Sequence, residues 1–180
     1  FAVYTVREGI VRFERVTEGG HRRIVRLAGR GDLIGQEALL QRPYRDEAIA
    51  CTAVQLCRLP RHLILALGRD EPALQQELMH RWQNALDAAE AWVADLATGP
   101  AKRRVLQLLA LLDRLGDDEG LIWLPRRDDM GAMLGITFET ASRMVSALRR
   151  EGVIELLPPT AARIHRPALQ AALRAQDADA

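Results

Sequence analysis

The sequence predicts an α+β fold in which short strands come first, one long helix follows, and short helices with a hairpin end the chain. Three observations support this prediction. Glycines separate short β-rich runs over residues 1–59. An apolar seam with helical spacing runs from Met79 to Leu96, and a second helical pattern followed by strand-like runs covers residues 128–165. We expect domain boundaries that divide the chain into residues 1–68, 69–98 and 99–180.

Composition restricts the class of protein. The 180 residues are 48% apolar and 27% charged, which is ordinary for a globular protein. The net charge is +1, although the basic residues are 24 arginines and one lysine, so no overall polycation points to nucleic acid. No run of about eighteen apolar residues exists, so we expect no membrane span. Two cysteines and no visible signal peptide favour a reducing, cytoplasmic location.

The first region reads as a small β-barrel or β-roll. Residues 3–6, 10–13 and 24–27 are β-branched or alternating runs that are typical of strands. Residues 17–20, Thr-Glu-Gly-Gly, predict a hairpin turn between two of these strands. Regular short strands with glycine turns are typical of closed or rolled antiparallel sheets.

The long helix is expected to begin after Asp70, which suits an N-cap, and to run to Thr98, where Gly99-Pro100 stops it. Such a helix is about 42 Å long. Its apolar stripe is too wide for one neighbour, so we expect one side to pack on the strands and the other on a second copy of the chain. A helix covered wholly within one chain is the alternative. The residues assigned to the dimer contact are Leu78, Met79, Trp82, Ala85, Leu86, Ala89, Trp92, Val93 and Leu96.

Residues 128–152 predict a helix-turn-helix. Gly135 ends the first helix, because glycine takes a positive φ without steric cost. Thr137 then occupies the N-cap of a second helix over residues 138–150. The strand-like residues 153–157 and 162–165 follow, joined by a turn, and would form a wing.

The outer face of the second helix carries groups that suit DNA. An outward arginine such as Arg143 can reach O6 and N7 of guanine, and Glu139 can accept from N4 of cytosine. Thr137 and Thr140 can bind phosphates near the helix start. The alternative is a plain helical hairpin with a solvated charged face, which the following wing disfavours.

The segment ITFETASRMVSALRREGVIEL is similar to the recognition helix of the cyclic-AMP receptor protein/FNR family of bacterial transcription regulators. The form Glu-x-x-Ser-Arg resembles the FNR branch more, since the other branch has arginine at Phe138 and glycine at Ser142. The resemblance implies half-sites like TTGAT and a homodimer, with RNA polymerase as a further partner if the protein activates. The DNA-contacting residues that it implies are Arg126, Arg127, Thr137, Phe138, Glu139, Thr140, Ser142, Arg143 and Ser146.

The stretch Gly-Asp-Leu-Ile-Gly at residues 31–35 resembles the cyclic-nucleotide-binding β-roll of the same family, which usually has two more strands before Phe1. The family binds the cyclic phosphate with an Arg-Ser or Arg-Thr pair before the alanine that matches Ala48. This chain has two carboxylates there, which would repel a phosphate. We therefore expect no cyclic-nucleotide binding by the usual mode, no evident cofactor, and an unknown effector. The candidate effector pocket consists of Gly35, Glu37, Ala38, Asp46 and Glu47.

A metal site is not expected. Cys57 matches one of four cysteines that hold an iron–sulfur cluster in the FNR branch, but the other three lie in an N-terminal segment that this chain lacks. Cys51 matches no ligand, and both cysteines are interpreted as small buried hydrophobic residues. A redox-, metal- or haem-sensing regulator stays open if an upstream segment supplies ligands.

The sequence thus predicts a dimeric, sequence-specific DNA-binding transcription regulator with a signal-sensing β-roll. An enzyme is not expected, because the sequence has no glycine-rich phosphate loop, no metal-spaced histidine cluster and no nucleophile–base pair. The alternative is a winged-helix protein-interaction module that does not bind DNA.

Overall fold

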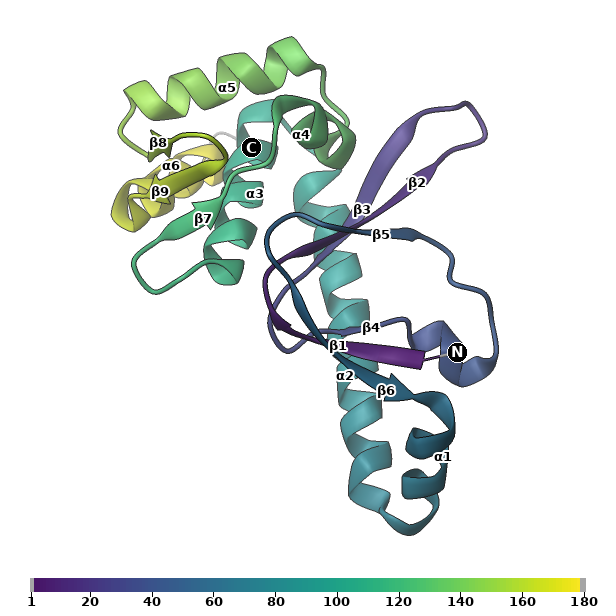
Figure 1. Cartoon of the computed structure of the whole chain (residues 1–180). Coiled ribbons are helices and arrows are strands. Elements are labelled where there is room, and N and C mark those ends of the chain that lie inside the picture. Colours follow the sequence, from purple (N-terminus) through teal and green to yellow (C-terminus); the bar gives the residue numbers. More distant parts are fainter. Residues whose placement is uncertain (1, 179–180) are drawn as a thin grey trace. The chain divides into compact units, whose positions relative to one another are not determined.

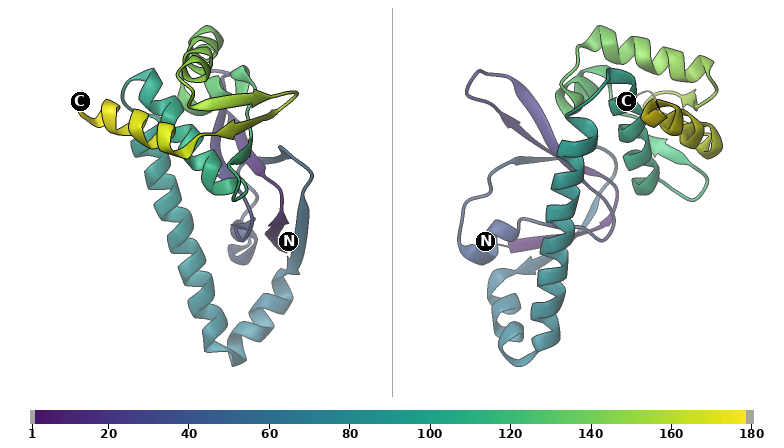
Figure 2. Two further views of the ribbon diagram at one scale, coloured as in Figure 1. Left: turned by 90° about the vertical axis from the view of Figure 1, so that its left-hand side faces the viewer. Right: turned by 180° about the vertical axis from the view of Figure 1, so that it is seen from behind.

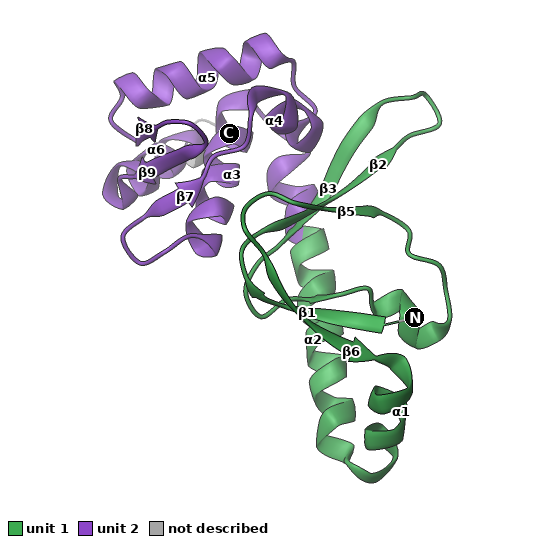
Figure 3. Ribbon diagram, in the orientation of Figure 1, with its two compact units in different colours: residues 1–90 green, residues 91–180 purple. Residues whose placement is uncertain are grey.

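The computed structural model describes residues 2–178, and the chain divides into two compact units, Phe1–Glu90 and Ala91–Ala180 (Figure 3). The predicted α+β architecture is confirmed, with strands in both units and the longest helix in the first (Figure 1). Among the described residues, no helix combines the length and the apolar character that a membrane span requires.

Unit 1 contains two three-stranded antiparallel sheets among its described residues, with strand orders β4-β1-β6 and β3-β2-β5. Figure 1 labels these strands, and Figure 2 shows the ribbon from two further directions. The expected strands and the hairpin turn are confirmed: Gly20 has φ of 77° and its N–H donates to the Thr17 carbonyl at 2.9 Å. The elements are β1 (Ala2–Glu8), β2 (Val11–Val16), β3 (Arg22–Ala28), β4 (Leu33–Ile34), the 3-10 helix η1 (Gln36–Leu40), β5 (Glu47–Ala50) and β6 (Gln55–Pro60).

The core of unit 1 lies between these strands and the helix that follows them. One buried cluster joins Val3 of β1, Leu33 of β4, Ala38 and Ile64, and Leu78 packs against it. A second cluster unites the two sheets through Val6, Val11, Ala28 and Ile34. Alternation along the strands therefore places the β-branched residues inside, as their sequence pattern predicts.

The helical segment after the strands differs from the prediction in its boundaries. It consists of α1 (Arg61–Asp70), α2 (Pro72–Ala91) and a π-helical turn, η2 (Trp92–Leu96). Asp70 is the last residue of α1 and not an N-cap. The break falls at Glu71 (φ −124°, ψ 89°), because the ring of Pro72 disfavours the helical conformation in the residue before it.

The expected end of this segment at Thr98 is also wrong. Helical geometry stops at Leu96. The Thr98 hydroxyl donates to the Ala94 carbonyl at 2.7 Å, the acceptor that a continuing helix would offer to the Thr98 backbone N–H.

Two residues assigned to the dimer contact pack inside their own units. Leu78 is partly buried against the roll cluster of unit 1. Leu96 is only 2% exposed and belongs to the core of unit 2. The assignment of Leu96 was wrong, because spacing alone cannot distinguish which of two apolar faces meets the same chain. A dimer contact by the exposed part of Leu78 stays a prediction.

Unit 2 is a helical domain with a small sheet of order β7-β9-β8, all antiparallel. The predicted helix-turn-helix and wing are confirmed, with the wing strands joined after Leu157. The elements are α3 (Ala101–Leu115), β7 (Leu121–Trp123), α4 (Arg127–Leu134), α5 (Phe138–Arg150), β8 (Ile154–Leu157), β9 (Ala161–Ile164) and α6 (Arg166–Ala178).

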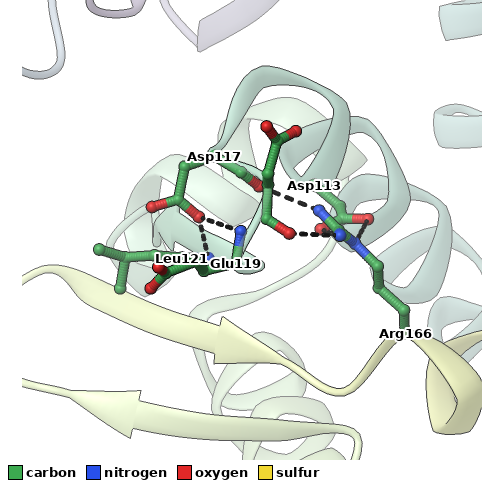
Figure 4. Close-up of polar contacts among 6 residues, drawn as sticks. Asp113, Asp117, Glu119, Leu121 and Arg166 are labelled. Atoms are coloured by element: carbon green, nitrogen blue, oxygen red, sulfur yellow. Dashed lines mark hydrogen bonds and ion pairs between the residues drawn. The ribbon is translucent and has the colours of Figure 1, made fainter.

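The helix α6 was not predicted, and its first residue ties it to the loop after α3 (Figure 4). The Arg166 Nε donates to both carboxylate oxygens of Asp113 at 2.9 and 3.1 Å. Its two terminal nitrogens donate to the carbonyls of Asp118 and Asp117 at 2.7 and 2.9 Å. The hydrogen bond to Asp113 is the main cause that raises the pKa of Arg166. One exposed guanidinium thus orders the loop between α3 and β7.

Candidate nucleic-acid interface

The turn between α4 and α5 is built from local signals that the sequence already displays. Gly135 adopts the left-handed conformation (φ 63°, ψ 39°) and its N–H donates to the Gly131 carbonyl at 2.9 Å. A Cβ atom on Gly131 would lie 2.8 Å from the Ile136 carbonyl oxygen, so α4 and the turn that follows it meet too closely there for a side chain. The Thr137 hydroxyl caps α5 by accepting from the Thr140 N–H at 3.2 Å.

The inner faces of the two helices are buried as expected. Their contact fixes the direction in which α5 presents its opposite face. The fully buried side chains are Met130, Met133 and Leu134 in α4, and Ala141, Val145 and Leu148 in α5.

The helix α3 holds both α4 and α5 through charged side chains that the sequence analysis missed. Arg104 donates to the Leu134 carbonyl at the end of α4, where the helix dipole favours a positive charge. Lys102 donates to both carboxylate oxygens of Glu151, just after α5, at 2.8 and 2.9 Å. These contacts join residues 30 and 49 positions apart, so no local pattern could have found them.

The outer face of α5 presents the side chains that were predicted to contact DNA. Phe138, Glu139, Arg143 and Ser146 are exposed, as is Thr137 before the helix. Thr140 and Ser142 are half-buried.

Three of these side chains form a short hydrogen-bonded row. The Thr137 hydroxyl donates to Thr140 Oγ1 at 3.1 Å, and Arg143 Nη2 donates to the same oxygen at 3.3 Å. Thr137 and Arg143 are exposed and Thr140 is half-buried, and both hydrogen bonds are open to solvent, where such a bond has a small net energy. The Arg143 guanidinium can therefore leave this row for a base edge at little cost.

Glu139 is held in its ionised form. Its backbone N–H is the main cause that lowers the pKa of its carboxyl, followed by the Thr137 hydroxyl, and the Arg143 charge acts in the same direction. The start of a helix also favours a negative charge. Glu139 thus remains a hydrogen-bond acceptor at neutral pH, which is the form that a cytosine amino group requires.

The two arginines before and at the start of α4 differ in solvent exposure. Arg126 is exposed, and its Nε lies 3.7 Å from the buried carboxylate of Asp129. Arg127 is half-buried, and burial lowers the pKa of its guanidinium. Arg126 is therefore the better placed of the two to reach a phosphate.

The five residues assigned to an effector pocket differ in their surroundings. Ala38 is a core residue with no exposed surface, so its assignment was wrong. Gly35 precedes η1 in the left-handed conformation, and Glu47 is exposed at the start of β5. The Asp46 carboxylate pairs with Arg15 of β2 at 2.7 Å. Glu37 and Asp46 both oppose the burial that lowers the pKa of Arg26.

Unit 1 instead has a cavity of about 380 Å³ between the β3–β4 segment and α2. Its polar groups include both signs of charge. Arg26 donates to the Leu33 carbonyl at 2.9 Å, and Arg81 pairs with Glu77 at 2.7 Å. The described residues that line it are Arg26, Leu27, Arg30, Gly31, Asp32, Leu33, Glu77, His80, Arg81, Asn84, Ala85 and Ala88.

The two cysteines are placed differently. Cys51 is half-buried after β5, whereas Cys57 is exposed on β6, opposite Thr5 of β1. The expectation that both are buried is wrong for Cys57, which lies in a run of exposed residues, 55–58, on β6. Within residues 2–178, no three His, Cys, Asp or Glu side chains gather as metal ligands.

A capped recognition-type helix, a tight preceding turn and a β-wing together define a winged helix-turn-helix domain, and a β-roll precedes it. Comparison with known proteins identifies the same two domains. Residues 2–71 match the model of the cyclic nucleotide-binding domain, and residues 103–171 match that of the Crp-like helix-turn-helix domain.

Two curated relatives resemble most of the chain. The "Cyclic AMP receptor protein" of Thermus thermophilus is 34% identical over 160 residues, which cover 88% of this chain and 73% of the relative. The "Transcriptional activator protein FnrL" of Cereibacter sphaeroides is 32% identical over 163 residues, covering 86% and 65%. The chain thus spans about two thirds of the length of the second relative. It belongs to the CRP/FNR family of bacterial transcription regulators, whose helix-turn-helix binds DNA.

Solved structures give the same result. FixK2 from Bradyrhizobium japonicum superposes with a TM-score of 0.83 at 27% identity, over 94% of this chain and 86% of that one. A CRP/FNR-family regulator from Thermus thermophilus superposes with a TM-score of 0.76 at 27% identity, over 98% and 89%. The roll, the long helix and the winged helix therefore occur together in experimentally determined relatives.

Proposed function

We propose that this DNA-binding regulator acts as a homodimer on a palindromic site with TTGAT-like half-sites, and that its roll senses a signal other than cyclic AMP. The observation that carries the proposal is the outer face of α5. There, Glu139 is ionised and exposed, and Arg143 lies one turn further along the same side. Such a pair can bind neighbouring base pairs in the major groove.

The FNR-like half-site is supported by two residues. Ser142 stands between Glu139 and Arg143 in the Glu-x-x-Ser-Arg form, and Phe138 stands where the cyclic-AMP receptor branch has arginine. One of the similar proteins is named for the FNR branch and is called an activator. If this chain activates transcription, RNA polymerase is its proposed further partner.

The dimer is supported by the apolar side of α2. Met79, Trp82 and Leu86 are 67%, 41% and 52% exposed. Within α2, all of which is described, no residue is buried in the single chain. Three large apolar side chains at helical spacing favour an isologous contact with the same helix of a second copy. Two recognition helices would then enter successive major grooves about 34 Å apart.

The roll is proposed to respond to a ligand other than cyclic AMP. The Asp46 carboxylate is neutralised by Arg15, while Glu47 keeps an exposed carboxylate near the position at which the family binds the cyclic phosphate. An anionic phosphate would meet a carboxylate there in place of a guanidinium. Calorimetry should detect no micromolar binding of cyclic AMP, and a micromolar affinity would refute this part.

The first test is fluorescence anisotropy on a TTGAT-N4-ATCAA duplex and a scrambled duplex at one fixed salt concentration. Selective binding is expected. If both duplexes bind equally weakly, the purified protein is used to select sites from random DNA. Failure to select any site would refute sequence-specific binding. That outcome would favour the alternative, a winged-helix module that contacts another protein.

A further inference from the structure

The start of the recognition helix carries an apolar side chain that the polar contacts above do not use. Phe138 is the first residue of α5 and is 51% exposed. The apolar residues Ala141, Val145 and Leu148 of the same helix are buried. Isolated exposed apolar side chains are common on protein surfaces, so exposure by itself has no functional meaning. The functional meaning of Phe138 comes from its position at the start of the recognition helix.

Phe138 lies on the side of α5 that is proposed to face DNA. Residues four apart on a helix are neighbours, so Phe138 adjoins Ser142, and the row formed by Glu139 and Arg143 lies beside them. The N-terminal residues of a recognition helix are those that reach base edges in the major groove. Because the Thr137 cap fixes the first turn, the phenyl ring starts from a defined position.

We propose that Phe138 packs against the C5 methyl group of a thymine and thereby selects thymine at one position of each half-site; this inference rests on the proposed function. A phenyl ring offers neither donor nor acceptor. Thymine presents a methyl group in the major groove, whereas cytosine presents an amino group that the ring would desolvate without replacing its hydrogen bond. Glu139 and Arg143 then bind polar base edges, and Phe138 binds an apolar one.

Deoxyuridine tests this proposal, because it removes one methyl group and keeps every hydrogen-bonding group of thymine. Each thymine of the bound site is replaced in turn, and affinity for the wild-type protein is measured by anisotropy. Burial of one methyl-sized group predicts a loss of about fourfold at one position, and of about fifteenfold when both half-sites are changed. Phe138→Ala removes the ring from both subunits, so it should bind the thymine site about fifteenfold more weakly and should not distinguish thymine from deoxyuridine.

Two further variants complete the experiment. Phe138→Leu keeps an apolar side chain and should keep part of the preference for thymine. Leu121→Ala removes another exposed apolar side chain of unit 2 and should keep all of it. Because Phe138 is exposed, the alanine variant should retain its fold, which circular dichroism verifies.

The outcomes separate this inference from the proposed function. Selective binding by the wild type without any effect of deoxyuridine would overturn the role of Phe138 alone. A Phe138→Ala variant that binds weakly but still prefers thymine would also overturn it, since the ring would then contact sugar or backbone. If the wild type binds no DNA selectively, including sites sought in random DNA, both proposals fail together.

Discussion

Two helices of this protein expose faces of opposite chemical character. Along α2, the exposed side chains include Met79, Trp82 and Leu86, which form an apolar stripe. Along α5, the exposed side chains include the ionised Glu139 and the guanidinium of Arg143. An apolar stripe gains energy by leaving water, which suits a second protein surface. A charged face that can exchange its hydrogen bonds suits the groove of DNA.

The largest effect, on the stability of the proposed dimer, is expected when a charged side chain is introduced into the apolar stripe. Leu86→Glu should disrupt the proposed dimer, because two buried leucine side chains, one per subunit, stabilise it by about 3–6 kcal/mol together. Sedimentation equilibrium measures the change. Val16→Glu is the matched control, since Val16 is 70% exposed on β2 and lies outside the stripe. A Leu86→Glu protein that remains dimeric would remove α2 from the interface.

The second largest effect, on the affinity for specific DNA, is expected from a change in the charged face of α5. Arg143→Ala should weaken binding to the specific site by about 1–3 kcal/mol per half-site, with little change on scrambled DNA, because a bidentate base contact is lost. Dimerisation should be unchanged. Arg149→Ala alters the same residue type on the same helix, and should retain specificity because Arg149 lies at its far end. Equal losses in both variants would mean that α5 contributes only general positive charge.

DNA binding by the charged face and dimerisation by the apolar stripe should depend differently on salt concentration. If Arg126 and Arg127 of both subunits neutralise four phosphates, a fourfold rise in salt should weaken DNA binding by about 10²-fold. The apolar dimer contact should not weaken under the same change. Arg126→Ala should reduce the slope of log affinity against log salt by about two, measured by anisotropy between low and moderate salt. An unchanged slope would show that Arg126 does not contact phosphate.

A smaller effect, on the free energy of unfolding, is expected from the contact by which α3 holds α4. Arg104→Met leaves the Leu134 carbonyl without its guanidinium donor, which should reduce the free energy of unfolding by about 1–3 kcal/mol. Urea denaturation measures this change. Arg114→Met is the matched control, because Arg114 is exposed on the same helix. Equal stability of the two variants would mean that solvent replaces the Arg104 contact.

The sequence by itself determined the elements whose causes are local. Gly135 and the Thr137 cap define the turn and the start of α5, and the glycine turn at residues 17–20 defines the β2–β3 hairpin. Each of these signals acts within about four residues, so the strands, the helix-turn-helix and the exposed face of α5 could be predicted. Helical periodicity also predicted that Glu139, Arg143 and Ser146 lie on the exposed side of α5.

Only the tertiary structure decided which apolar and charged groups find partners far along the chain. It placed Ala38 in the roll core with Leu78 packed against it, paired Asp46 with Arg15, and joined Arg166 to the loop after α3. Spacing gives every apolar residue of a helix the same character, whichever neighbour covers it. A contact between residues 31 or 53 positions apart depends on the whole fold, because only packing brings such groups within hydrogen-bonding distance.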